Sequence, residues 1–130
     1  EHDCQGVLSL MNENLYYLMQ ACSMGSFADD YQKIDMSDEV AVSAVLTSGR
    51  KSGSVITGLD DLDENTKVAH FNTIKNKYLE YETSGDRTLL VTRNAKTINR
   101  ATESLYEELD LIKYDGKKHR KDLCLMHEYN

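Results

Sequence analysis

Apolar side chains recur every three or four residues along the first part of the chain. Between residues 3 and 23 the repeat holds without interruption, through Cys4, Val7, Leu8, Met11, Leu15, Leu18, Met19 and Cys22. This spacing places the apolar side chains on one face of a helix. The sequence therefore predicts a helix over residues 3–23, followed by a polar connection over residues 23–34.

Three further helices are predicted from repeats of the same kind. Ser37 has the chemistry of an N-cap, and Asp38 and Glu39 suit the positive end of a helix dipole, so a second helix is expected to begin there. A third helix is expected from about residue 60 to 81, and the longest from about residue 87 to 113. The residues after Gly116 are expected to form a short helix or a tail.

The glycine-rich segment TSGRKSGSVITG separates the second predicted helix from the third. A glycine inside a helix costs about 1 kcal/mol relative to alanine, so this segment is expected to be a loop. Long helices joined by modest connections favour an all-α fold, namely an antiparallel bundle of four long helices with a short C-terminal helix or tail. We expect one helical domain over residues 1–130.

Composition and charge narrow the classes of partner. The net charge of −7 argues against a surface for nucleic acid or anionic lipid, because both require a surplus of Lys and Arg. No run of about 20 apolar residues is present, so no membrane insertion is expected. The sequence begins on Glu, which we interpret as the start of a secreted, extracellular protein after removal of a signal peptide. A segment of a larger protein is the alternative.

The three cysteines allow at most one internal disulfide. In a single helix, Cys4 and Cys22 would lie about 27 Å apart, whereas a disulfide requires Cα atoms within about 7 Å. In an antiparallel bundle the end of the fourth helix returns to the level of Cys4. This topology predicts a disulfide between Cys4 and Cys124; if the tail instead crosses the bundle, the partner of Cys124 is Cys22.

Several short motifs match catalytic or metal sites only in part. Ser48 and Lys51 have the spacing of a Ser-x-x-Lys nucleophile, but the companion motifs are missing. Asp61, Asp63 and Asn65 match the first ligands of a calcium loop, which then lacks its glycine and its closing glutamate. The His and Cys spacings do not form a zinc motif. We therefore expect no metal, no cofactor and no enzymatic activity.

Candidate binding residues fall into three groups. The glycine-rich loop offers two cations on an acidic chain, the paired tyrosines cannot both face one core, and the run KKHRKD is densely basic. The alternatives are a tolerated linker, aromatic rings that seal helix ends, and a solvated charged face. The predicted partner-binding residues are Arg50, Lys51, Ser52, Tyr16, Tyr17, Lys117, Lys118 and Arg120.

The whole pattern resembles the anophensin and albicin family of anopheline mosquito salivary proteins. The resemblance is carried by a small, acidic chain without proline or tryptophan, a Cys-led first helix, the stretch LYYLMQAC and a Cys near the carboxyl end. It implies a secreted salivary inhibitor that binds a host plasma protein. The implied target is the alternative complement pathway, through its convertase, or a protease of the contact system.

Two other functions fit the predicted bundle. A helical carrier of a small hydrophobic ligand could line an adaptable pocket with Met11, Met19, Met24 and Met36, although Met at helical spacing is more often core. A bacterial periplasmic sensor or immunity domain would have the same fold.

Overall fold

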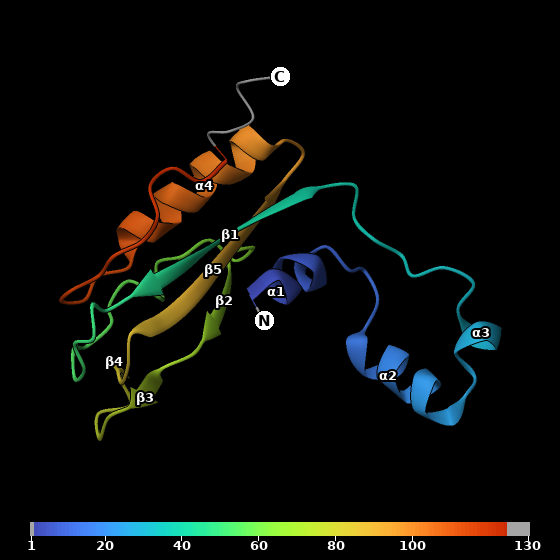
Figure 1. The fold of residues 1–130 in the computed structure, drawn as a ribbon, viewed down its shortest axis with the longest axis horizontal. Coiled ribbons are helices and arrows are strands. Elements are labelled where there is room, and N and C mark those ends of the chain that lie inside the picture. The colour runs from blue at the N-terminus through green and yellow to red at the C-terminus, as the bar shows by residue number, and fades with distance from the viewer. Residues whose placement is uncertain (1, 125–130) are drawn as a thin grey trace.

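The structure is a computed structural model that describes residues 2–124. Figure 1 shows a small sheet with helices on both faces and a helical arm that extends to one side. The elements in chain order are α1 (His2–Ser9), α2 (Leu15–Met24), α3 (Phe27–Asp30), β1 (Val40–Thr47), β2 (Lys67–His70), β3 (Thr73–Lys75), β4 (Tyr81–Thr83), β5 (Arg87–Ala95) and α4 (Ile98–Leu111).

The main sheet has three antiparallel strands in the order β1-β5-β2. Val40 lies opposite Ala95, and the pairing continues to a bulge between Leu46 and Thr47. β2 pairs with the other side of β5, with Lys67 opposite Thr92. A separate hairpin of β3 and β4 lies between β2 and β5 along the chain.

Alternate residues of β1 face two different helices. Val42, Ala44 and Leu46 are buried in the core cluster that includes α4. Ala41, Ser43 and Val45 line a shallow hollow that α1 borders with Gly6 and Val7. Because successive side chains of a strand point to opposite faces, α1 and α4 lie on opposite sides of the sheet.

The core lies between α4 and the sheet. The amphipathic α4 contributes three fully buried residues, Ala101, Leu105 and Leu109. The side chain of Thr97 caps the start of this helix by accepting a hydrogen bond from the backbone N–H of Arg100 at 3.3 Å. The remaining buried members of this cluster are Val42, Ala44, Leu46, Ile56, Leu89, Val91 and Ile112.

The all-α prediction is wrong, and β1 shows why. The apolar residues of VAVSAVLT fit a helical repeat and a strand equally well on such a short segment. β-branched residues favour the strand, and pairing with β5 supplies the backbone hydrogen bonds. The segment after Ser37 is therefore a strand rather than the second helix of a bundle.

The other three predicted helices are also wrong in extent or type. The helix expected over residues 3–23 is two helices, α1 and α2, with residues 10–14 outside both. Residues 60–81 form loops, β2 and β3 instead of a third helix. Residues 87–113 divide into β5 and α4, so only the second half of the predicted fourth helix is helical. Residues 88–92 of β5 are all buried, without alternation, because it is the central strand and is covered on both faces.

The predicted disulfide between Cys4 and Cys124 is absent, because all three cysteines are free. Cys4 lies on α1, whereas Cys124 packs against the core cluster on the α4 side of the sheet. The antiparallel return that was expected to bring the two thiols together does not exist in this fold. No helix within residues 2–124 has the length and apolarity to cross a membrane.

Candidate functional site

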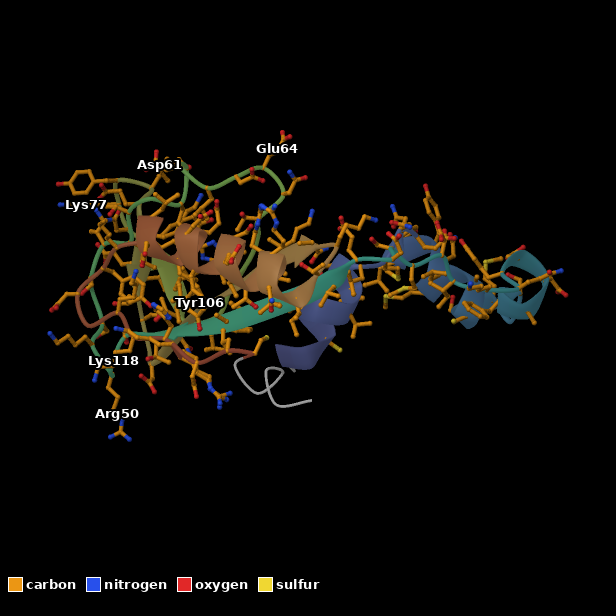
Figure 2. All side chains as sticks on the ribbon, turned by 90° about the horizontal axis from the view of Figure 1, so that it is seen from above. Arg50, Asp61, Glu64, Lys77, Tyr106 and Lys118 are labelled. Atoms are coloured by element: carbon orange, nitrogen blue, oxygen red, sulfur yellow. The ribbon has the colours of Figure 1, made fainter. Side chains whose placement is uncertain are left out.

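Two segments far apart in the sequence meet at the end of the sheet opposite the helical arm. Thr47 and Lys118 exchange backbone hydrogen bonds of 2.8 and 2.9 Å, which fix the glycine-rich loop beside the segment that follows α4. Figure 2 shows Arg50 and Lys118 extending from this end. We call residues 48–54 and 113–121, together with the turn at residues 84–86, the basic edge.

Ser48 is the buried anchor of the basic edge. Its backbone N–H donates to the carbonyl of Asp86 at 2.8 Å, and its Oγ donates to the carbonyl of Gly85 at 2.9 Å. Its side chain is fully buried. A hydroxyl so placed holds two loops together and is not available as a nucleophile, so the spacing of Ser48 and Lys51 has no catalytic meaning here.

Gly116 allows the closest approach between the two segments. Its φ is +78°, and a Cβ at this position would lie 2.4 Å from the carbonyl oxygen of Ser48. Any other residue would be strained and would collide with the backbone. Glycine is therefore required where the segment after α4 crosses the glycine-rich loop.

Lys117 has a structural role in the same segment. Its Nζ donates to the carbonyls of Leu109 and Ile112 at 2.7 and 2.6 Å, which are free because the helix ends there. A cation at this position also complements the negative end of the helix dipole. Partial burial lowers the pKa of Lys117.

A shallow hollow of about 690 Å³ lies beside the segment that follows α4. Three lysines and a histidine face one aspartate in its lining, so its charge is opposite to that of the whole chain. The ring of His119 lies 5.9 Å from that of Tyr106, and the Tyr106 hydroxyl donates to the Arg120 carbonyl at 3.2 Å. The lining residues are Tyr106, Asp110, Lys117, Lys118, His119 and Lys121.

The cations of the basic edge differ in how strongly they are already paired. Lys51 contacts Asp115 at 2.7 Å, and this hydrogen bond lowers the pKa of Asp115. Arg120 contacts Asp122 at 2.6 Å. Within residues 2–124, Lys118 and Lys121 form no ion pair and are exposed. Arg50 and Lys113 are also exposed and without an ion pair among the described residues, but of these four cations only Lys118 and Lys121 line the hollow.

This arrangement can bind an anion. Two exposed ammonium groups at the rim of one hollow suit a phosphate or a carboxylate, because Lys acts as a point charge for such groups. Within the described residues, no group of three or more His, Cys, Asp or Glu side chains could hold a metal ion.

The segment that resembles a calcium loop, residues 61–65, is held in place by hydrogen bonds within the protein. Asp63 Oδ1 accepts from Arg93 Nη1 at 2.8 Å and from the backbone N–H of Asn65 at 2.8 Å. The hydrogen bond from Arg93 is the main reason why the pKa of Asp63 falls to about 2. Asp63 therefore tethers a loop to β5.

The structure brings together two of the three predicted binding groups. Arg50, Lys51 and the exposed Ser52 lie in the glycine-rich loop, beside the segment that carries Lys117, Lys118 and Arg120. The tyrosine pair, Tyr16 and Tyr17, lies on α2 at the other end of the molecule (Figure 1).

The predicted binding residues leave out several residues that line the hollow or shape the basic edge. Tyr106, Asp110, His119 and Lys121 line the hollow, and Gly116 permits the loop crossing. The run KKHRKD was a usable signal for His119 and Lys121. Tyr106 and Asp110 lie on α4, and only the return of the chain along that helix brings them to the hollow.

Comparison with known proteins gives a consistent family. Residues 40–125 match the family described as "Phosphoribosylglycinamide synthetase, C domain". A phosphoribosylamine–glycine ligase of Neisseria meningitidis serogroup A is 31% identical over 127 residues, which cover 94% of this chain and 30% of the relative. The ligase of Halalkalibacterium halodurans is 38% identical over 92 residues, which cover 66% of this chain and 21% of the relative.

Two further similarities agree with these matches. The trifunctional purine biosynthetic protein adenosine-3 of Chironomus tentans is 29% identical over 128 residues, which cover 93% of this chain and 9% of the relative. A crystal structure of the phosphoribosylamine–glycine ligase of Thermotoga maritima matches with a TM-score of 0.62 at 19% identity, over 80% of this chain and 27% of that one. At 19% identity, the similarity to the Thermotoga maritima structure supports the fold alone.

These findings correct the functional predictions. The resemblance to anopheline salivary proteins is wrong. The function that it implied, inhibition of complement or of the contact system, and the implied host plasma partner are therefore wrong as well. The hydrophobic carrier is likewise contradicted. The relatives are enzymes, which contradicts the prediction of a non-enzymatic protein. Secretion stays a prediction from the sequence alone.

The matched region decides the assignment. The family match covers well over half of the chain and extends from the first residue of β1 past the end of α4. The chain spans only about a third or less of the length of the curated relatives that it matches. The chain belongs to the family of the phosphoribosylglycinamide synthetase C domain.

Proposed function

We propose that this chain supplies the C-domain part of a phosphoribosylamine–glycine ligase, an enzyme that joins an amine to glycine. The observation that carries the proposal is the family match over residues 40–125, which contain the whole sheet, α4 and the basic edge. The rest of the enzyme lies in the same polypeptide or in a second one.

The basic edge supports a specific role in this reaction. Phosphoribosylamine carries a phosphate ester with close to two negative charges near neutral pH. Lys118 and Lys121 offer ammonium groups at the rim of a hollow that is large enough for such a group. The chain would thus hold the phosphate end of the amine substrate.

Holding the phosphate helps the reaction without a reactive side chain from this domain. An anchored phosphate removes most of the translational and rotational freedom of the amine, and so favours its productive encounter with glycine. The proposed contribution is therefore binding and orientation.

A growth experiment tests the proposed function. The segment of the Neisseria meningitidis ligase that matches this chain is replaced by this chain, and the chimera is expressed in a bacterium that lacks its own ligase. Growth without added purine is the expected result. A soluble, folded chimera that does not restore growth would contradict the proposal.

Charge variants of the same chimera test the role of the basic edge. Lys118→Ala with Lys121→Ala is expected to raise the KM for phosphoribosylamine about tenfold or more, because two phosphate contacts are lost. The matched control is Lys33→Ala with Lys77→Ala, which removes two exposed charges elsewhere. If both pairs of substitutions raise the KM equally, the basic edge contributes only to the net charge and does not contact the phosphate.

A further inference from the structure

The outward face of α2 is unusually apolar. The helix LYYLMQACSM contains no charged residue, and only Leu18 and Ala21 are buried. A surface helix of a soluble domain normally has a polar outer face. We call the five exposed large side chains the α2 face: Leu15 at 42% exposure, Tyr16 at 66%, Tyr17 at 57%, Met19 at 63% and Met24 at 72%.

The helix is well formed despite this exposure. Asn14 accepts a hydrogen bond from the backbone N–H of Tyr16 at 2.9 Å, which caps the start of α2. Gly25 ends the helix with φ of +72°, and the next N–H bonds the carbonyl of Ala21 at 3.0 Å. Figure 1 shows α2 and α3 as an arm that leads away from the sheet.

The comparisons indicate what covers this face. The C-domain match begins at residue 40, after α3, so the arm is not part of the C domain itself. The Neisseria ligase and the Chironomus protein nevertheless match along 94% and 93% of this chain, arm included, although this chain is only 30% and 9% of their length. In these relatives the segment that corresponds to the arm is therefore part of a much longer protein.

The surface of the arm has the chemistry of a protein contact. A hollow of about 310 Å³ between α2 and the residues after it is bordered by Tyr17, Met24 and Tyr31, with Asp30 at its rim. Tyr and Met are enriched at the centre of protein interfaces. Exposed Asp29 and Asp30 beside them favour a partner that presents basic residues at the rim of its own surface.

We propose that the α2 face docks onto the part of the ligase that lies outside the C domain, and that the arm thereby joins the two parts. This inference rests on the proposed function for the identity of its partner. The occupant is a second portion of the enzyme rather than a second copy of this chain, because the longer relatives contain the same segment.

Hydrogen exchange of the α2 amides tests the docking. In the isolated chain these amides are expected to exchange at least tenfold faster than in the Neisseria chimera, whereas those of β5 stay slow in both. The same measurement is made on the isolated chain mixed with the remainder of the Neisseria ligase, in case the chimera does not fold. Equal α2 rates with and without the remainder of the enzyme would overturn the proposal.

A pair of substitutions identifies the surface. Tyr16→Ser with Met19→Ser is expected to abolish the extra protection of α2 and to lower the Tm of the chimera by several degrees, with no such fall in the isolated chain. The matched control is Ile74→Ser with Tyr78→Ser, since these side chains are 54% and 70% exposed on the β3–β4 hairpin. Equal losses from both pairs would overturn the assignment to α2.

The outcomes separate docking from catalysis. Protection of α2 in a chimera that does not support growth would uphold the docking and contradict the proposed function. Growth of the chimera without protection of α2 would uphold the proposed function and contradict the docking. A dimer of the isolated chain in sedimentation that Tyr16→Ser with Met19→Ser abolishes would make the α2 face a self-association surface and overturn the proposed occupant.

Discussion

Gly116 shows how one residue can hold two distant loops together. Its positive φ and the 2.4 Å approach of the Ser48 carbonyl oxygen to the Cβ position leave no room for a side chain. Gly53 has a similar φ of +80°, but no atom lies within 4 Å of its Cβ position. A side chain at Gly53 would thus meet backbone strain alone, whereas a side chain at Gly116 would meet both strain and a steric collision.

We expect Gly116→Ala to destabilise the fold by more than about 2 kcal/mol, because strain and collision both act. Gly53→Ala should cost only about 1 kcal/mol, the strain of a left-handed alanine. Urea denaturation of both variants measures the difference. Equal losses would mean that the loop crossing relaxes around a methyl group.

Asp63 is the residue with the clearest acid dependence. Its pKa of about 2 in the folded chain lies below the ordinary value of 3.8, mainly because Arg93 donates a hydrogen bond to it. A depressed carboxyl pKa stabilises the fold above the ordinary value, and this stabilisation is lost as the pH falls from about 4 to about 2.

Asp63→Asn should therefore be less stable than the wild type at pH 7. The gap should narrow as the pH falls from about 4 to about 2, because the wild-type carboxylate is then protonated. Urea midpoints of both proteins at several pH values between 2 and 7 provide the measurement. A gap of constant size across this range would show that the ion pair with Arg93 contributes nothing.

At the scale of elements, two neighbouring lysines after the end of α4 make different contacts. Lys117 Nζ donates to two terminal carbonyls of the helix, whereas Lys118 lines the hollow and forms no ion pair within residues 2–124. Adjacent lysines in one run thus have different tasks.

Exchanging each lysine for methionine should reveal this difference. Lys117→Met is expected to cost about 1–2 kcal/mol of stability, since two charge-assisted hydrogen bonds to the helix end are lost. Lys118→Met should change stability by less than about 0.5 kcal/mol, as for an ordinary surface site. Thermal unfolding of both variants tests the assignment, and a larger loss from Lys118→Met would reverse the two roles.

Elements also show where local pattern is sufficient. The apolar repeat of α4 was predicted because one face packs on the sheet and the other faces water, which produces a period near 3.6. The predicted loop at residues 48–58 is confirmed as a loop between β1 and β2. β5 was not identified because burial on both faces removes the alternation that marks a strand.

At the scale of the whole molecule, charge is unevenly distributed. The chain has a net charge of −7, yet the hollow beside the segment after α4 is lined by three lysines and a histidine. An acidic molecule with a local basic hollow repels most anions at long range and binds them only at short range. Binding should therefore depend on salt through a few nearby charges.

We expect inorganic phosphate to shift the backbone amide resonances of residues 117–121. The apparent affinity should fall several-fold between about 20 and 200 mM sodium chloride, because chloride competes and screening increases. Lys118→Glu with Lys121→Glu should abolish the shifts. Shifts that persist in this variant would place the anion elsewhere.

The sequence by itself determined the local features of this protein. It was sufficient for the amphipathic α4, the helical character of α2, the glycine-rich loop and the basic run, because each depends on neighbours within a few residues. It was also sufficient to mark Arg50 and Lys51 in one segment, and Lys117 and Lys118 in another, as cations on an acidic chain. These properties arise from spacing, propensity and charge, which short segments carry alone.

Only the tertiary structure decided between helix and strand for β1 and β5, and it alone joined the glycine-rich loop to the segment after α4. Pairing of β1 with β5 and the contact between Thr47 and Lys118 connect residues that are about 40 to 70 positions apart, and no local pattern encodes such partners. The separation of Cys4 from Cys124 follows from the same cause. Which face of a strand meets which helix is settled by packing across the sheet, where distant segments compete for the same apolar surface.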